Sequence, residues 1–241
     1  MLNRIVWDRL SSLSCAFYHF VDRQECLSYP AFGASRVRFM INNDNEETRA
    51  EAAGIIVAGG VIAFRTDTFY GLGADPFNAT AVAKIRELKS REDNKPILLL
   101  ISDATEVDRF LVQRTPAFDA TAARHWPGPI TLIGNARANL PEQLTAGTKS
   151  IGLRLPDDDG LRSLLRQCGG ALTATSANPS GSPPARTARD VENYFPNGID
   201  LIIDGGVVAA TQPSTVLDVS GTNACLVREG VILRAEISAL K

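Results

Sequence analysis

The sequence contains few of the residues on which many metal sites and hydrolases depend. Only two of its 241 residues are histidines, so we expect neither a His-rich metal site nor a Ser-His-Asp hydrolase. The four cysteines form no CxxC pair, zinc-knuckle spacing or disulfide framework. No apolar run approaches the roughly 20 residues that span a bilayer. The formal net charge of −2 gives no overall field for nucleic acid, although a local basic patch is compatible with it.

The remaining composition is that of a folded protein. The chain is 44% hydrophobic and 22% charged, which excludes a disordered chain and provides enough apolar residues for a sizeable core. The length fits one large domain or two small ones. We expect a cytoplasmic protein that makes no contact with a membrane.

The first forty residues differ from the rest of the chain. They hold seven of the sixteen aromatic residues and show no persistent helical or alternating period. Acidic residues at 8, 22 and 25 argue against a signal or transit peptide. Met1 and Met40 are the only methionines, so we hypothesise that Met40 is the native start and that residues 1–40 form a poorly structured extension. A genuine N-terminal appendage is the alternative, and mass spectrometry of the native N-terminus would distinguish the two.

From residue 45 onward, the pattern predicts alternating helices and strands. Helices are expected over 46–58 and 158–168, over 79–89 with Asn78 as its cap, and from Asp103 onward. Strands are expected at 61–64, 97–101, 130–133, 151–155, 171–175, 199–204, 214–219, 225–228 and 231–234. This alternation predicts a single α/β domain over residues 41–241, whose sheet is covered by helices.

A polar stretch follows the first of these strands, where α/β folds bind ligands. Thr66, Asp67 and Thr68 come directly after the strand at 61–64, beside glycines that let backbone N–H groups approach a ligand. A turn that merely caps the next helix would use the same residue types. Gly71-Leu72-Gly73 lacks the third glycine of a dinucleotide fingerprint, and no P-loop motif occurs, so we interpret this GxG as a tight turn.

A cluster of cations lies between a predicted helix and the strand at 97–101. Lys89, Arg91 and Lys95 would complement the dipole at the end of the helix. The same cations would also suit a polyphosphate, because lysine binds phosphate as a point charge and arginine as a bidentate fork. The residues alone leave both interpretations open.

Three polar residues lie on or beside later strands. Ser176 and Asn178 are two positions apart, so on an extended chain both point the same way and can bind a ligand's polar edge. A solvated loop is the alternative. Arg154 lies within an apolar strand, where a cation needs an anionic partner, either a ligand carboxylate or a structural Asp.

Taken together, these stretches resemble the threonylcarbamoyl-AMP synthases of the YrdC/Sua5 type. The family motifs TxTxYGLG, KxR followed by Lys-Pro, WPGPLT, RxP, SxN and a late Ser-Thr have counterparts here in the same order, at residues 66–73, 89–96, 126–131, 154–156, 176–178 and 214–215. Each motif is short, but the combination is highly specific. The resemblance implies a twisted mixed sheet flanked by helices, with a concave ligand cleft, in the short single-domain form of the family.

The resemblance also implies an activity, that of a nucleotidyltransferase. L-threonine, bicarbonate or CO₂, and ATP with Mg²⁺ would give L-threonylcarbamoyl-AMP and pyrophosphate, and no metal-binding residues of the protein are expected. The product would supply the t6A modification of tRNA through separate transfer proteins. Direct binding of tRNA would be weak.

The resemblance assigns roles to residues at matching positions. Lys89, Arg91, Ser176 and Asn178 would be catalytic. ATP would be bound by Lys89, Arg91, Lys95, Ser150, Asn178 and Ser214. Threonine would be bound by Thr68, Arg154 and Ser176, with Arg154 on its carboxylate.

The sequence departs from the family pattern at several positions, and other functions are compatible with it. Arg65 and Glu92 stand where proline is usual, His125 replaces an aromatic residue, and Leu100 stands where some archaeal relatives have a threonine-contacting His. The alternatives are a YciO-like paralogue without synthase activity, an RNA-binding module and a carbamoyl-transfer domain. Intact KSR and SAN motifs favour the synthase, and Cys168 is expected in the core rather than in catalysis.

Overall fold

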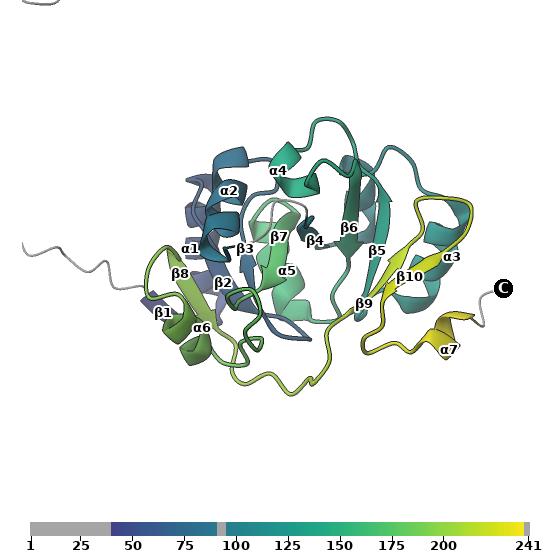
Figure 1. Cartoon of the computed structure of the whole chain (residues 1–241). Helices are drawn as coiled ribbons and strands as arrows, with labels where there is room; N and C mark the ends of the chain where they lie inside the picture. Colours follow the sequence, from purple (N-terminus) through teal and green to yellow (C-terminus); the bar gives the residue numbers. More distant parts are fainter. Residues whose placement is uncertain (1–39, 91–94, 239–241) are drawn as a thin grey trace, which may run out of the picture. The chain divides into compact units, whose positions relative to one another are not determined.

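The computed structural model describes residues 40–90 and 95–238, which are organised around one mixed β-sheet (Figure 1). In this part of the chain ten strands lie in the order β1-β8-β2-β3-β7-β4-β6-β5-β9-β10, with both parallel and antiparallel neighbours. They are β1 (Met40–Asn43), β2 (Ile62–Arg65), β3 (Tyr70–Gly73), β4 (Leu98–Ile101), β5 (Ile130–Asn135), β6 (Ser150–Arg154), β7 (Ala171–Ser176), β8 (Leu201–Asp204), β9 (Thr215–Asp218) and β10 (Cys225–Arg228). The predicted mixed α/β sheet is confirmed.

The helices begin where the sequence provides capping side chains. Asn45, Asn78 and Asp158 each accept a backbone N–H of the first turn, at 2.9, 3.1 and 2.9 Å. The segment after Asp103 is a single 3₁₀ stretch rather than an α-helix. The elements are α1 (Glu46–Val57), α2 (Ala79–Leu88), the 3₁₀ helix η1 (Ala104–Arg109), α3 (Pro116–His125), α4 (Glu142–Thr145), α5 (Asp159–Gln167), α6 (Ala188–Tyr194) and α7 (Arg234–Ser238).

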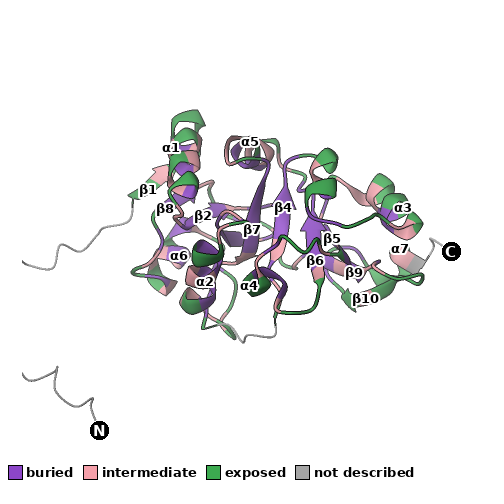
Figure 2. Cartoon of the chain, turned by 90° about the horizontal axis from the view of Figure 1, so that it is seen from above, coloured by how far each residue is buried: buried purple, intermediate pink, exposed green. Residues whose placement is uncertain are grey.

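Helices pack on both faces of the sheet, with α1 and α5 on one side and α2 and α6 on the other (Figure 2). The apolar residues of α1 and α5 pack against β2, β7 and β8, and form the smaller core cluster. The larger cluster holds residues of α2, α3, α4 and α6 against the opposite face. Cys168 packs beside the smaller cluster, as expected from the sequence.

Alternation along the strands determines which residues face the core and which face open space. On β4, Leu99 and Ile101 belong to the larger cluster, whereas Leu98 and Leu100 face the other way. On β6, Leu153 lies in the core and Arg154 on the opposite face. The side that α1 and α5 cover only in part therefore has room for a cavity over β4 and β6.

The predicted strand at 231–234 is wrong. Ile232 is buried, but Val231 and Leu233 are 44% and 50% exposed, and α7 begins at Arg234. The N–H of Ile232 donates to Thr215 Oγ1 at 3.0 Å, and Thr215 Oγ1 donates to the Ile232 carbonyl at 2.7 Å. The hydroxyl takes the place of a neighbouring strand, because the backbone groups need partners of some kind.

The predicted tight turn at Gly71-Leu72-Gly73 is also wrong, because these residues form β3, antiparallel to β2. A side chain at Gly73 would place its Cβ 2.5 Å from the Phe64 ring. The glycine is thus required by packing between neighbouring strands rather than by a turn. The turn itself lies earlier, at residues 66–69.

Two predictions about the ends of the domain are not decided. The extension over residues 1–40 lies outside the described residues except for Met40, which begins β1 and pairs with Leu201 of β8. The native start at Met40 therefore stays a prediction.

In the described part of the chain, no helix combines the length and the apolar character needed to cross a membrane.

Candidate active site

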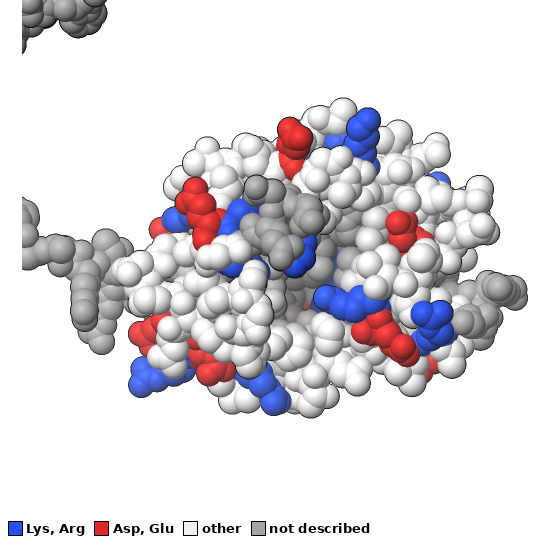
Figure 3. Space-filling view, viewed as in Figure 1, with Lys and Arg blue, Asp and Glu red and all other residues white. Residues whose placement is uncertain are grey.

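A cavity of about 650 Å³ opens over the middle of the sheet, on the face that carries Leu98 and Leu100. Its polar side chains come from separate elements: Thr66, Thr68, Thr131, Arg154, Ser176, Thr211, Ser214 and Arg228. The surface is hollowed near its middle, and Lys and Arg side chains border the hollow (Figure 3). The structure therefore brings together four of the residues predicted for binding: Thr68, Arg154, Ser176 and Ser214.

Arg154 ends β6 and is only 3% exposed. Its Nε donates to the Gly128 carbonyl at 3.3 Å, its Nη1 donates to Thr68 Oγ1 at 3.1 Å, and its Nη2 pairs with Asp67. Burial lowers the pKa of Arg154, and the charge of Asp67 acts against that shift. Arg154 therefore has a structural acid as its partner, and it also lines the cavity, so the ligand carboxylate stays a prediction.

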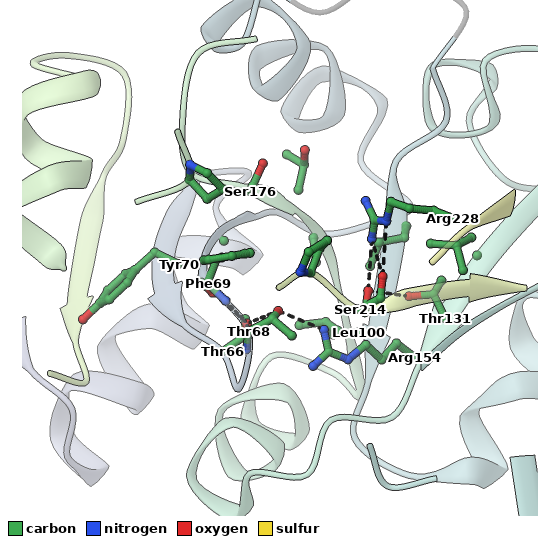
Figure 4. A pocket seen from close by; sticks show the side chains of 18 of the residues that line it. Thr66, Thr68, Phe69, Tyr70, Leu100, Thr131, Arg154, Ser176, Ser214 and Arg228 are labelled. Atoms are coloured by element: carbon green, nitrogen blue, oxygen red, sulfur yellow. Dashed lines mark hydrogen bonds between the residues drawn. The ribbon is translucent and has the colours of Figure 1, made fainter. Parts of the chain in front are cut away.

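The turn between β2 and β3 presents two threonine hydroxyls to the cavity. Thr66 Oγ1 lies 3.1 Å from Thr68 Oγ1 and donates to the Phe69 carbonyl at 2.7 Å. The N–H groups of Thr68 and Phe69 donate to the same hydroxyl oxygen, at 3.1 and 3.2 Å. This network closes the turn on itself, so the hydroxyl of Thr68 is held beside Arg154 (Figure 4).

Arg228 is a residue of the cavity that the sequence interpretation missed. It ends β10, and its Nη2 donates to the carbonyl and hydroxyl oxygens of Ser214, at 2.7 and 3.3 Å. Ser214 Oγ lies 3.2 Å from Thr131 Oγ1 (Figure 4). Arg228 is exposed overall, but partial burial of its guanidinium lowers its pKa, and the charge of Arg154 lowers it further. The available signal was a cation at the end of a predicted apolar strand, the same signal that identified Arg154.

Lys89 does not line the cavity but lies behind its wall. It follows α2, is 3% exposed, and its Nζ donates to the carbonyl oxygens of Ser176 and Asn178, the latter at 2.6 Å. The Lys89 carbonyl accepts the Ser180 hydroxyl at 3.0 Å. The two predicted motifs KxR and SxN are thus joined directly, with the lysine ammonium supporting the backbone that carries Ser176.

Asn178 is buried beside the same segment. Its Nδ2 donates to the carbonyls of Pro179 and Ser182, at 2.9 and 2.7 Å, which folds the following loop over the side chain. Its Oδ1 is buried without a hydrogen-bond partner among the described residues. A buried acceptor of this kind is costly unless a donor arrives, for example from a ligand or from water.

Two further predicted site residues, Lys95 and Ser150, do not line the cavity. Lys95 is exposed. Ser150 begins β6 and shares a face with Gly152 and Arg154, four residues from the arginine. Arg91 lies outside the described residues.

The cavity offers cations and hydroxyls rather than carboxylates. In residues 40–90 and 95–238 no three His, Cys, Asp or Glu side chains are grouped so that they could hold a metal ion. Arg154 and Arg228 supply two guanidinium groups, which favour anionic ligands such as carboxylates and phosphates.

A long connection between β8 and β9 closes one side of the cavity and carries Thr211, Pro213 and Ser214. The Tyr70 hydroxyl anchors its start, because its single proton is shared between Asp204 Oδ1 and the Gly206 carbonyl oxygen, at 3.1 and 2.9 Å. The phenol points away from the cavity centre (Figure 4). Burial, followed by the charge of Asp204, raises the pKa of Tyr70, so the group stays a neutral donor.

Comparison with known proteins points to one family. The family model for Sua5, YciO and YrdC, described as "Telomere recombination", matches residues 54–230. A threonylcarbamoyl-AMP synthase of Marinobacter nauticus is 39% identical over 172 residues, which are 70% of this chain and 90% of the relative. One from Bacillus subtilis is 34% identical over 81% of this chain, but only 57% of that longer protein is covered.

Solved structures with the same fold agree with the sequence comparison. The crystal structure of P. abyssi Sua5 complexed with L-threonine is 31% identical, with a TM-score of 0.80 over 83% of this chain and 60% of that chain. The crystal structure of E. coli YciO is 28% identical, with a TM-score of 0.71 over 80% of this chain and 95% of that chain. A HypF structure at 16% identity shares the fold alone.

Proposed function

The chain belongs to the Sua5/YciO/YrdC family, and we propose that it is a nucleotidyltransferase that forms L-threonylcarbamoyl-AMP and pyrophosphate from L-threonine, bicarbonate and ATP. The observation that carries the proposal is that Thr68, Arg154 and Ser214 line a single cavity with a second arginine, Arg228. A reaction that joins a carboxylate-bearing amino acid to a nucleotide needs two anion sites close together, and the two guanidinium groups supply them.

Threonine binds at the Arg154 end of the cavity. The guanidinium takes the amino-acid carboxylate, and the Thr68 hydroxyl, already hydrogen-bonded to it, lies beside the same ligand. Ser176, on the neighbouring β7, completes the subsite. A relative of this chain, P. abyssi Sua5, has been crystallised with L-threonine, which supports this choice of amino acid.

ATP binds along the wall formed by Ser214, Arg228 and the segment that Lys89 supports. The family resemblance assigns the triphosphate to Lys89 and Arg91, with Lys95 adjacent, and the Lys89 ammonium would have to leave the carbonyls of Ser176 and Asn178 to reach it. Ser150 lies further along the face of β6 and contacts the nucleotide. The unpartnered Oδ1 of Asn178 suits a donor from the substrate.

The chemistry requires positioning and charge neutralisation rather than a protein nucleophile. The threonine amine attacks CO₂ derived from bicarbonate with loss of a proton, and an oxygen of the resulting carbamate attacks the α-phosphorus of ATP. The P–O bond to the β-phosphate breaks, and pyrophosphate leaves. Mg²⁺ arrives with the triphosphate and neutralises part of its charge. The cationic side chains of the cavity stabilise the charge that develops on the phosphates, and the fixed turn at Thr68 orients the amino acid.

The product is consumed elsewhere. A threonylcarbamoyl-AMP released in the cytoplasm passes to separate t6A-transfer proteins that act on tRNA, and this chain itself binds tRNA weakly. The net charge of −2 favours this division, because tight binding of RNA normally needs a strong basic surface.

The experiment that tests the proposal measures pyrophosphate release from ATP, Mg²⁺ and bicarbonate, with and without L-threonine. Mass detection of the adduct runs alongside. Threonine-dependent release together with the adduct is the expected result. A protein that binds ATP or RNA but releases no pyrophosphate would instead be a YciO-like paralogue or a binding module.

A further inference from the structure

We propose that Asp67 is a positioning residue for threonine: it sets the direction and the effective charge of Arg154 before the amino acid arrives. The inference rests on the proposed function, because it takes Arg154 as the group that binds the substrate carboxylate. Asp67 belongs to the turn between β2 and β3, and the family resemblance assigns it no role. Its side chain is 18% exposed and pairs with the Nη2 of Arg154.

The hydrogen bonds of Arg154 use only some of its donors. A guanidinium has five N–H donors. Within the described residues, one is used on Gly128, one on Thr68 and one on Asp67. One N–H on Nη1 and one on Nη2 therefore stay available, and each can donate to an oxygen of a ligand carboxylate. If Asp67 were absent, only the bonds of Nε to Gly128 and of Nη1 to Thr68 would hold the guanidinium.

Asp67 acts through Arg154 and not on the ligand. Thr66 and Thr68 line the cavity, whereas Asp67, between them, does not. The turn that carries it is closed by the Thr66 hydroxyl, which bonds to both Thr68 and Phe69. The carboxylate is thus presented from a rigid segment, as a residue that positions another should be.

The ion pair between Asp67 and Arg154 gives the two arginines of the cavity different local charges. Asp67 compensates the charge of Arg154, whereas among the described residues no carboxylate pairs with Arg228. A polyphosphate carries more negative charge than an amino-acid carboxylate, so the uncompensated arginine attracts it more strongly. Asp67 thereby reserves Arg154 for the carboxylate, and its loss should allow phosphates to compete there.

The test is isothermal titration of L-threonine into the full chain without ATP. In Asp67→Ala, the Kd for threonine should rise about tenfold or more, because the guanidinium loses its alignment, while the KM for ATP changes by less than about twofold. The matched control is Asp158→Asn. Asp158 is also 18% exposed and pairs at 3.0 Å with Arg65, the last residue of β2 before the same turn. An asparagine there keeps the cap of α5, so this variant should bind threonine as the wild type does.

Asp67→Asn keeps the size of the side chain, so this variant tests the positioning role if Asp67→Ala fails to fold. Its amide oxygen still accepts from Arg154 but brings no charge. Pyrophosphate should therefore become a competitive inhibitor against threonine in Asp67→Asn and not in the wild type.

A double-mutant cycle separates positioning from a general effect on the turn. If Asp67 acts through Arg154, adding Asp67→Ala to Arg154→Ala should not weaken threonine binding further. Additive losses would overturn the proposal. Wild-type affinity in both Asp67 variants, with no competition by pyrophosphate, would also overturn it while the proposed function stands. A wild-type protein that binds no threonine would overturn the function and this inference together.

Discussion

The ammonium group of Lys89 donates to the carbonyl oxygen of Asn178 at 2.6 Å, across 89 positions of the sequence. It donates to the Ser176 carbonyl as well. A cation that is 3% exposed and bound to two backbone carbonyls holds the end of β7 against the end of α2. The geometry of the cavity wall at Ser176 therefore depends on a residue outside the cavity.

Lys89→Met should abolish turnover and also lower stability. The substitution leaves two buried carbonyl oxygens without their charged donor, which costs on the order of 1–3 kcal/mol. Urea unfolding and pyrophosphate release would measure the two effects. Arg91→Ala provides the comparison, because the triphosphate role assigned to it predicts lost turnover with an unchanged unfolding midpoint. Normal turnover in both variants would remove the triphosphate assignment.

Arg154→Ala should raise the KM for threonine much more than the KM for ATP. The carboxylate would lose a charge-assisted, bidentate partner, which corresponds to a loss of about tenfold to a thousandfold in affinity. Steady-state kinetics with each substrate varied in turn would show the difference. Arg189, which is 79% exposed on α6, is the control site. A threonine KM that stays normal in folded Arg154→Ala would exclude the carboxylate role.

Arg228→Ala should give the opposite pattern, with a raised KM for ATP and little change for threonine. The side chain pairs with no carboxylate of the described chain, and it donates to the Ser214 carbonyl and hydroxyl at one end of the cavity. A neutral residue there would weaken attraction to phosphate, and the salt dependence of ATP binding should decrease with it. Fluorescence titration with an ATP analogue at two salt concentrations would measure both. An equal rise of the KM for ATP and the KM for threonine would contradict the assignment of Arg228 to the ATP subsite.

His125→Phe should stabilise the fold, and more so in acid. The Nε2 of His125 is buried without a partner among the described residues, and burial lowers the pKa of the side chain, with the charge of Arg124 acting the same way. Because the folded pKa lies below the unfolded value, the unfolded chain binds more protons, and stability falls as the pH drops through about 6.5.

Urea unfolding at pH 8 and pH 5.5 would measure the effect of this change. The gain expected at pH 8 is about 1 kcal/mol, from removal of the unsatisfied group. At pH 5.5 the gain should be larger. An equal gain at the two pH values would show that the histidine does not titrate as burial requires.

The sequence predicted the elements that are encoded locally. Asn78 and Asp158 mark helix starts because capping acts over three residues, and the apolar run at 97–101 indicates a buried strand by itself. β3 was not predicted, because Gly73 is explained only by the Phe64 ring of the adjacent strand. A contact between two neighbouring strands cannot be recognised from the residues of one strand alone.

The site was predicted in part, for the same reason. Thr68, Arg154, Ser176 and Ser214 belong to motifs that the family resemblance identifies, and they meet in one cavity. Arg228 lies outside any such motif, and its contact with Ser214 joins positions 14 residues apart. Asp67 lies within a motif, but its contact with Arg154 spans 87 residues and could not be read from spacing.

The alternation of β4 and β6 has a consequence for how the family can diversify. Leu98 and Leu100 touch the cavity, while their neighbours Leu99 and Ile101 hold the core together. Substitutions at the even positions would reshape the binding space and leave the larger cluster intact, although Leu100 also belongs to the smaller cluster. A single inserted or deleted residue in β4 would exchange the two sets at once, placing core side chains in the cavity. Ligand preference in such a fold can therefore evolve by replacement of side chains, whereas a change of strand length would disrupt the core and the cavity together.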